Sequence, residues 1–194
     1  LALGLLYRQF DAFAYVGAAN RDYFRAFGVP AERLFFSPHS VEAARFDPDD
    51  AAIAAAARLR RDHGLEGRRV VLFAGKFHPR KQPLELLRAF QEVAGPNDAL
   101  VFVGDGELRS ESEAAARSRP ERCVRLLPFA NQTEMPARYR LADIFALPSR
   151  GFYETWGLAV NEAMHLGVPC LVSDLVGCQR DLVTAGETGW VFAA

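Results

Sequence analysis

The sequence contains few cysteines, and their pattern gives no disulfide framework. Among 194 residues only Cys123, Cys170 and Cys178 are cysteine, and no two of them form a C-x-x-C pair. The number is odd, and two of the three lie in apolar runs typical of buried strands. These features favour a reducing compartment, and we expect a cytoplasmic protein.

The sequence also has no excess of charge of one sign and no complete dinucleotide fingerprint. Lys and Arg total 23 against 24 Asp and Glu, so no general attraction to nucleic acid or to an anionic membrane is expected. Gly104 and Gly106 begin a G-x-G run, but Arg109 stands where G-x-G-x-x-G needs its third glycine. Any phosphate binding must therefore depend on a local group of cations, and no nucleic-acid partner is predicted.

A targeting signal and an initiator methionine are absent too. The apolar opening "LALGLLYRQFDAF" carries Arg8 and Asp11 too early for a membrane span, and it lacks the parts of a signal peptide. The last residues, "GWVFAA", have the character of a strand with no helix after it. We expect a fragment of a longer protein whose C-terminal unit lacks its final helices.

What the sequence does contain is an alternation, from Arg68 onward, of short apolar runs and longer amphipathic segments. Strands are predicted over 69–75, 99–104, 123–129, 143–149, 169–173 and 189–193, and helices over 83–94, 107–118, 134–142 and 157–166. Alternation of this kind is typical of βαβ units, and strands apolar on both faces are covered by helices on both sides. The predicted fold is α/β, a Rossmann-like parallel sheet with helices on both faces, whose ligands bind beyond the carboxyl ends of the strands.

A separate strand, helix and strand are predicted upstream, within residues 12–38, followed by a polar connection over 39–50 and an alanine-rich helix over 51–64. We therefore predict two domains, with 1–45 as the remnant of an N-terminal domain and its linker, and 46–194 as the C-terminal domain. Asp47-Pro48-Asp49 could suggest a divalent metal, but capping of the following helix by Asp49 or Asp50 explains it more simply. No metal site is predicted.

Two glutamates, Glu154 and Glu162, stand in the stretch "GFYETWGLAVNEAMHLGVPC". On one helix they would lie about 12 Å apart, beyond the roughly 5 to 9.5 Å between glycosidase carboxylates, so a hydrolytic pair is disfavoured. The local pattern places Glu154 in a loop and Glu162 one to two turns into a helix that begins near 156–158. Free N–H groups at that helix start could bind an anion. The alternative is that Glu154 complements the helix dipole and Glu162 is a solvated surface residue.

A basic loop follows the strand that ends at Gly75. It carries Lys76, Arg80 and Lys81, and cations at the carboxyl end of a strand can meet a phosphate. Such a loop can also be simply solvated surface. His39 and Glu42 of the connection are left open as either cleft or linker residues.

Together these segments resemble the retaining GT-B glycosyltransferases, specifically the family 4 (group 1) enzymes that use nucleotide-activated sugars. The most specific element is the E-x7-E stretch in "ETWGLAVNEAMHLGVPCLVSD". The segments "LFAGKFHPRKQPLELLRAF", "VFVGDGELR", "ADIFALPS" and "VGCQRDLV" also occur in the order that this family shows. The resemblance runs from about Phe13 to Trp190, and it implies that residues 46–194 are the C-terminal, nucleotide-sugar-binding half of a GT-B fold.

The resemblance also implies a role for each candidate residue. Lys76 and Lys81 would hold the donor diphosphate, and with Glu154 they form the predicted catalytic set. Glu154 would contact the sugar, and Glu162 the ribose hydroxyls. Main-chain atoms near Phe129 would face the base, and main-chain atoms near the helix start would face phosphate or sugar. The remaining donor-binding positions are Gly75, Phe129, Gly157 and Leu158.

Three positions depart from the commonest family pattern. Lys76 stands where arginine is frequent, which keeps the charge but loses the bidentate guanidinium fork. Gln82 stands where glycine is frequent, and Cys178 where a second glycine often follows Gly177. These differences concern subgroup and substrate more than fold.

The implied reaction is transfer of a hexosyl group from a nucleotide-diphosphate sugar to an acceptor with retention of configuration. It would need no metal, no cofactor and no protein nucleophile, because the lysines and the helix start would stabilise the leaving diphosphate. The acceptor stays open as a glycan, a lipid-linked molecule or a small molecule, and peripheral membrane contact would come through the missing N-terminal domain. Alternatives are a non-catalytic nucleotide-binding or interaction module, a sugar-nucleotide epimerase or a phosphorylase. The fragment alone is expected to bind donor weakly and to transfer little.

Overall fold

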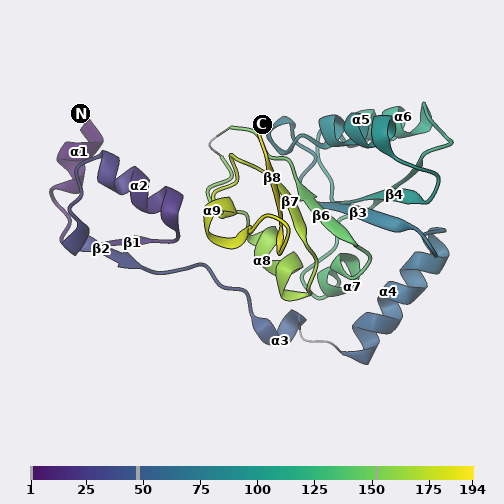
Figure 1. Ribbon diagram of the computed structural model, residues 1–194, viewed down its shortest axis with the longest axis horizontal. Coiled ribbons are helices and arrows are strands. Elements are labelled where there is room, and N and C mark those ends of the chain that lie inside the picture. The colour runs from purple at the N-terminus through teal and green to yellow at the C-terminus, as the bar shows by residue number, and fades with distance from the viewer. Residues whose placement is uncertain (1, 47–48, 152) are drawn as a thin grey trace.

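The computed structural model describes residues 2–46, 49–151 and 153–194. The N-terminal segment, residues 2–36, contains a small two-stranded parallel sheet and two helices (Figure 1). Its elements are α1 (Ala2–Tyr7), β1 (Phe13–Tyr15), α2 (Ala18–Ala26), η1 (Ala31–Arg33) and β2 (Leu34–Phe36). The predicted strand, helix and strand are confirmed, whereas α1 was not predicted.

The connection between the two sheets is less irregular than its polar sequence predicts. It contains one helical turn, α3 (Ala43–Phe46), because Phe46 is buried and packs beside the rings of Tyr139 and His165. The alanine-rich helix α4 (Asp50–Asp62) follows, and the Asp49 carboxylate accepts a hydrogen bond of 2.6 Å from the backbone N–H of Ala52. The predicted cap is thereby confirmed, while Asp47 and Pro48 lie outside the described residues.

The large sheet has six strands, all parallel, in the order β5-β4-β3-β6-β7-β8. Its strands are β3 (Arg69–Ala74), β4 (Asp98–Val103), β5 (Cys123–Leu127), β6 (Ile144–Leu147), β7 (Cys170–Ser173) and β8 (Gly189–Phe192). Strand order changes direction between β3 and β6, and ligands of such sheets bind at this point, beyond the carboxyl ends.

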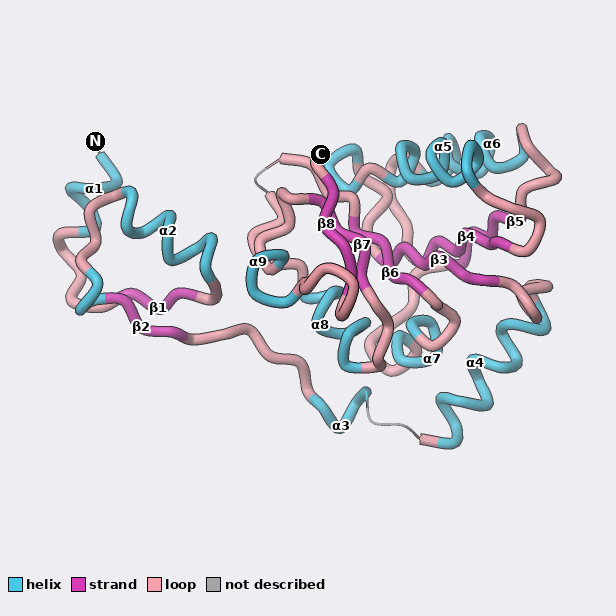
Figure 2. Tube along the Cα trace, viewed as in Figure 1, coloured by secondary structure: helices cyan, strands magenta, loops and turns pink. Residues whose placement is uncertain are grey.

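Helices cover both faces of this sheet, as predicted (Figure 1 and Figure 2). Those after β3 are η2 (Pro79–Lys81), α5 (Pro83–Val93), α6 (Arg109–Arg117), α7 (Met135–Tyr139), α8 (Leu158–His165) and α9 (Gln179–Leu182). Helices α5 and α6 lie together on one face, whereas α4, α7 and α8 lie on the other. The α/β, Rossmann-like architecture predicted from the sequence is confirmed.

Alternation along β4 explains the two hydrophobic cores. Ala99, Val101 and Val103 point into the core beneath α7 and α8, while Leu100 and Phe102 point into the core beneath α5 and α6. Successive side chains of a strand face opposite sides, so one apolar run fills both cores.

Element ends differ from the predictions by a few residues. The strand predicted to reach Phe129 ends at Leu127, because Pro128 has no N–H to continue the ladder. The four-residue helix α9 was not predicted. Among the residues described, no helix is long and apolar enough to cross a bilayer. The domain division after residue 45 stays a prediction.

Candidate functional site

Two adjoining cavities lie where the carboxyl ends of β3, β4 and β6 meet the start of α8. The wide cavity, of about 740 Å³, extends from β3 and β4 to the loop after β5, and the narrow cavity, of about 370 Å³, extends to the helix start. Gly75 and Lys76 line both. Phe129 and Glu162 line the wide cavity. The narrow cavity takes the remaining predicted site residues, Lys81, Glu154, Gly157 and Leu158.

All eight predicted site residues therefore lie around one connected region, although they come from segments far apart in the sequence. Chain order alone does not bring them together. The topology of the parallel sheet does, because every strand ends at the same edge.

A close approach of two backbones forms the floor of the wide cavity. Gly104 has φ 142°, and a Cβ added there would lie 2.0 Å from the carbonyl oxygen of Gly75. Only glycine fits this contact, so the turn after β4 packs directly against the end of β3. The G-x-G run that fails as a dinucleotide fingerprint thus helps to shape the cavity.

Glu154 is held by two donors on one oxygen. Its Oε2 forms an ion pair with Lys81 Nζ and accepts a hydrogen bond of 2.9 Å from the hydroxyl of Ser149. Ser149 is itself buried, and its carbonyl oxygen accepts a hydrogen bond from the Ser173 hydroxyl. These contacts hold the carboxylate at the edge of the narrow cavity and leave Oε1 without a hydrogen bond from the described residues.

The loop that carries Glu154 is also tied through its backbone. The N–H of Gly177 donates to the Glu154 carbonyl at 2.9 Å, and the N–H of Cys178 donates to the Trp156 carbonyl at 2.9 Å. Helix α8 begins four residues after Glu154, and its first turn holds no acidic residue. Glu154 is therefore not a first-turn residue of α8, and it lies in the loop before the helix, as the local pattern predicts.

Glu162 is fixed by a buried tyrosine. The hydroxyl of Tyr139, which is 1% exposed, donates to Glu162 Oε2 at 2.6 Å. Burial, and then the nearby charge of Glu162, raise the pKa of Tyr139 well above its usual value, so the phenol stays protonated and remains a donor. Glu162 is not the solvated surface residue of the alternative interpretation. Its other carboxylate oxygen is available to accept a hydrogen bond.

The start of α8 supplies backbone donors. Gly157 precedes the helix with φ 101°, and Leu158 and Ala159 line the narrow cavity in the first turn. The first N–H groups of a helix have no acceptor within the helix, and they carry the positive end of its dipole. This cavity therefore combines backbone donors with the ammonium groups of Lys76 and Lys81.

The basic loop is divided between two cavities. Lys76 and Lys81 line both the narrow cavity and a third cavity of about 330 Å³, whereas Arg80 lines only the third of these. The ring of His78 accepts a hydrogen bond of 3.1 Å from the backbone N–H of Arg80, so it stabilises the turn. Gln82, the one non-glycine residue with positive φ among the residues described, ends that turn at φ 55°.

His39 and Glu42, whose roles the sequence leaves open, lie in different surroundings. His39 lines the narrow cavity and lies 5.8 Å, between ring centroids, from Trp156. Glu42 forms an ion pair of 2.5 Å with Arg45 instead. His39 is thus a cleft residue, and Glu42 lines none of the cavities described here.

Sequence reasoning missed Tyr139 and Ser149 as partners of the two glutamates. Neither residue lies in a motif that signals this role, because both contacts depend on packing between separate elements. Within residues 2–46, 49–151 and 153–194, no group of three or more His, Cys, Asp and Glu side chains could hold a metal ion.

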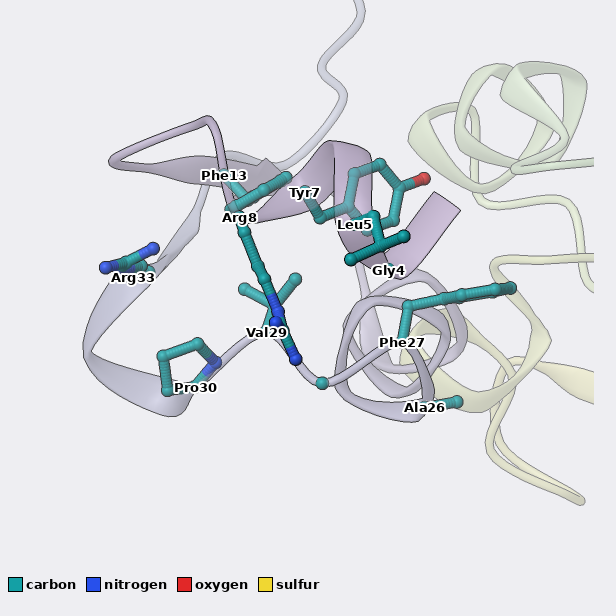
Figure 3. A pocket seen from close by; sticks show the side chains of 11 residues that line it. Gly4, Leu5, Tyr7, Arg8, Phe13, Ala26, Phe27, Val29, Pro30 and Arg33 are labelled. Carbon is teal, nitrogen blue, oxygen red and sulfur yellow. The ribbon is translucent and has the colours of Figure 1, made fainter. Parts of the chain in front are cut away.

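A further cavity, of about 420 Å³, lies in the N-terminal segment and takes no part in this site (Figure 3). Its lining is largely apolar and includes two arginines, Arg8 and Arg33. The full set is Gly4, Leu5, Tyr7, Arg8, Phe13, Ala26, Phe27, Gly28, Val29, Pro30 and Arg33. None of these residues lines the cavities at the large sheet.

Solved structures share this fold. A crystal structure of Anabaena Alr3699/HepE in complex with UDP-glucose is similar over 94% of this chain and 50% of that one, with a TM-score of 0.77 and 21% identity. The fold is that of GT-B glycosyltransferases.

A family model defines the class further. Residues 56–194 match the model for glycosyl transferases group 1, and the chain belongs to this family. Two curated relatives are similar in sequence. GDP-mannose-dependent alpha-(1-6)-phosphatidylinositol monomannoside mannosyltransferase of Mycolicibacterium smegmatis is 32% identical over 189 residues, which cover 93% of this chain and 48% of the relative. D-inositol 3-phosphate glycosyltransferase of Pseudarthrobacter chlorophenolicus is 30% identical over 171 residues, covering 84% and 39%. The chain therefore spans half or less of the length of these relatives.

Proposed function

We propose that this chain is the donor-binding part of a retaining, metal-independent hexosyltransferase that uses a nucleotide-diphosphate sugar. The observation that carries this proposal is the arrangement of the eight site residues around two adjoining cavities, with Lys76 at their junction. The name of the Mycolicibacterium relative mentions GDP-mannose and that of the Anabaena complex mentions UDP-glucose, which supports a donor of this chemical class.

The donor would lie across both cavities. The nucleoside would occupy the wide cavity, with the base near Phe129 and the ribose hydroxyls at Glu162. Because Tyr139 occupies one carboxylate oxygen of Glu162, the other is left to accept from a hydroxyl group. The diphosphate would pass Gly75 and Lys76 into the narrow cavity, and the sugar would reach Glu154.

Leaving-group stabilisation would be the main catalytic contribution. As the bond from the anomeric carbon to the diphosphate lengthens, negative charge grows on the leaving oxygens. The ammonium groups of Lys76 and Lys81 and the N–H groups at the start of α8 would stabilise it, as preorganised dipoles and charges do in enzyme sites. Positive charge that grows on the sugar ring would face the Glu154 carboxylate. Attack from the same face needs no protein nucleophile.

The acceptor would be bound largely by a part of the parent enzyme outside this chain, since the chain spans half or less of its relatives. We therefore propose that these residues bind donor weakly and transfer little by themselves. We also propose a cytoplasmic setting, with any membrane contact made outside the residues described here.

Calorimetric titration with UDP, GDP and ADP, and with their sugar conjugates, tests the donor site. One diphosphate should bind best, and Lys81→Ala should weaken it at least tenfold by removing a charge from the phosphates. Glu162→Ala should reduce the preference for a ribonucleotide over its 2′-deoxy or 3′-deoxy form. Glu121→Ala, an exposed glutamate before β5 at the opposite edge of the sheet, is the matched control and should change nothing. Equal binding by Lys81→Ala, Glu162→Ala and the parent would contradict the proposal.

A further inference from the structure

The third cavity, which we name the basic cavity, has Lys or Arg at half of its lining positions. It shares Lys76, Lys81 and Glu154 with the narrow cavity, and its volume of about 330 Å³ lies within the range of about 300 to 1,000 Å³ typical of ligand pockets. Four of its residues are Lys or Arg and one is an acid. The complete lining is Lys76, His78, Arg80, Lys81, Ser149, Arg150, Tyr153 and Glu154.

Two of these cations have no role in the proposed donor site. Arg80 and Arg150 line the basic cavity but neither the wide nor the narrow one. Among the described residues, no carboxylate lies within ion-pairing distance of either guanidinium group, whereas Lys81 is paired with Glu154. The charge of the basic cavity is therefore uncompensated on the side formed by the two arginines.

The two arginines are joined through the backbone, and an aromatic ring stacks on Arg80. The N–H of Arg150 donates to the carbonyl oxygen of Arg80 at 2.7 Å, which joins the loop after β3 to the loop after β6. The Arg80 guanidinium carbon lies 3.5 Å from the centroid of the Tyr153 ring. Stacking of this kind occupies the face of a guanidinium group and leaves the N–H groups on its edge free to bind a carboxylate or a phosphate.

From this geometry we propose that the basic cavity binds a second anionic group, a carboxylate or a phosphate, beyond the donor diphosphate. The group would be carried either by the transferred sugar or by the acceptor, because the cavity adjoins the Glu154 end of the donor site. This inference rests on the proposed function and names the substrate class of the same site. An acidic sugar or a phosphorylated acceptor would be favoured over its neutral counterpart.

The first experiment places the anion on the donor. If UDP is the diphosphate that binds best, calorimetry compares UDP-glucose with UDP-glucuronate, which differs by a carboxylate on the sugar. If GDP binds best, GDP-mannose and GDP-mannuronate are compared instead. If the donor carries the anion, the acidic donor should bind about tenfold more tightly to the parent chain, the gain typical of a charge-assisted contact. In the double variant Arg80→Gln and Arg150→Gln, the ratio should fall to about one. The exposed Arg117→Gln is the matched control and should keep the preference.

The second experiment places the anion on the acceptor. Glucose 6-phosphate and glucose are titrated into the chain saturated with the selected diphosphate. If the acceptor is the source, glucose 6-phosphate alone should bind, and the double variant should lose that binding. Tyr153→Leu, which removes the stacking partner but no charge, should weaken the preference partially in whichever experiment is positive.

A preference for the anion in either experiment, lost in the double variant, supports the inference. If the parent chain binds the diphosphate but shows no preference for the anionic ligand in either experiment, the subsite alone is overturned. Absence of diphosphate binding by the parent would overturn the proposed function and the subsite with it. The diphosphate titration therefore distinguishes the two failures.

Discussion

The N-terminal segment and the six-stranded sheet use the same strand and helix pattern, yet they bury their aromatic side chains very differently. Phe73, Phe102 and Phe145 in the large sheet are 0% exposed, whereas Phe35 and Phe36 at β2 are 57% and 61% exposed. The large sheet has helices on both faces, and the small sheet has two strands and α2 packed against β1. Burial thus depends on the number of layers around a strand and not on its residue types.

The two regions meet at the start of α2. Both carboxylate oxygens of Asp181 accept from the backbone N–H of Ala18 at 3.0 Å, and Arg180 pairs with Asp22 at 2.7 Å. Gly17 lies so close to Trp156 that a Cβ on it would be 2.4 Å from the indole ring. A helix whose own N-cap is glycine, with no side-chain acceptor, is therefore capped by the other region.

The largest effect is expected when matched aromatic residues of the two regions are truncated and the free energy of unfolding is compared. Phe102→Ala should lower the free energy of unfolding by about 3 to 5 kcal/mol, because it opens a cavity in the core beneath α5 and α6. Phe36→Ala should lower it by less than about 1 kcal/mol, since its ring is already largely in water. Urea unfolding followed by circular dichroism measures both. Similar losses would show that the N-terminal segment is as tightly coupled to stability as the large sheet.

Alkaline pH should destabilise the large sheet through its buried thiols. Burial, and then the charge of Cys178, raise the pKa of Cys170 from 9.0 to about 12. Above pH 9 the unfolded chain releases this proton while the folded chain retains it, so stability present below pH 9 is lost as pH rises toward 12. By pH 11 the loss should be about 2 to 3 kcal/mol for this thiol.

The measurement is a urea midpoint at pH 8 and at pH 11 for the parent and for Cys170→Ala. The parent should lose more stability than the variant between these values, because the variant lacks the thiol. Cys123→Ala, at a less buried position in β5, is the control. An equal loss in parent and Cys170→Ala would contradict the prediction.

The contact between the regions is tested by Asp181→Ala. Loss of the cap on α2 should speed amide hydrogen exchange at the start of that helix about fivefold, since removing a capping acceptor typically costs about 1 kcal/mol. Amides of β4 should keep their protection. Asp11→Ala, an exposed aspartate that makes no such contact in the described structure, is the matched control. Unchanged exchange in α2 would show that Asp181 does not hold the regions together.

The smallest effect is expected at Gln82, which adopts φ 55° in the large-sheet region, whereas in the N-terminal segment positive φ is confined to Gly28. Left-handed backbone costs an L-residue about 1 to 2 kcal/mol, so Gln82→Gly should stabilise the chain by about 0.5 to 1 kcal/mol. Loss of the 2.9 Å bond from Gln82 Nε2 to the Pro79 carbonyl offsets part of this gain. Thermal unfolding measures it, and Gln82→Ala should lower stability instead.

The sequence predicted the long elements of the fold because their periodicity is strong. The strands of the large sheet and the longer helices were found to within a few residues, whereas α1, α3 and α9 were missed. Helix α3 depends on the contact of Phe46 with Tyr139, which is distant in the sequence, and no local sequence pattern predicts such a contact. Family resemblance anticipated that Gln82 stands where glycine is frequent, and its left-handed backbone gives the physical reason.

For the site, the sequence predicted which residues would gather but not what holds them. Parallel topology brings Lys76, Lys81, Glu154 and Glu162 to one edge, and this could be reasoned from the alternation of strands and helices. The donors that fix the two carboxylates, Ser149 and Tyr139, come from separate elements and were invisible to spacing.

The turn at Gly177 has a consequence for how the molecule is made. A Cβ there would lie 2.0 Å from the carbonyl oxygen of Thr155, and the N–H groups of Gly177 and Cys178 donate hydrogen bonds to the loop that carries Glu154. That loop precedes β7 in the chain, but the groups that hold it come after β7. During synthesis, which proceeds from the N-terminus, the glutamate loop must therefore wait for about twenty further residues before its backbone can be tied in place. The adjacent strands β3 and β4 are synthesised much earlier and can pair first, so the narrow cavity is completed only after they have paired.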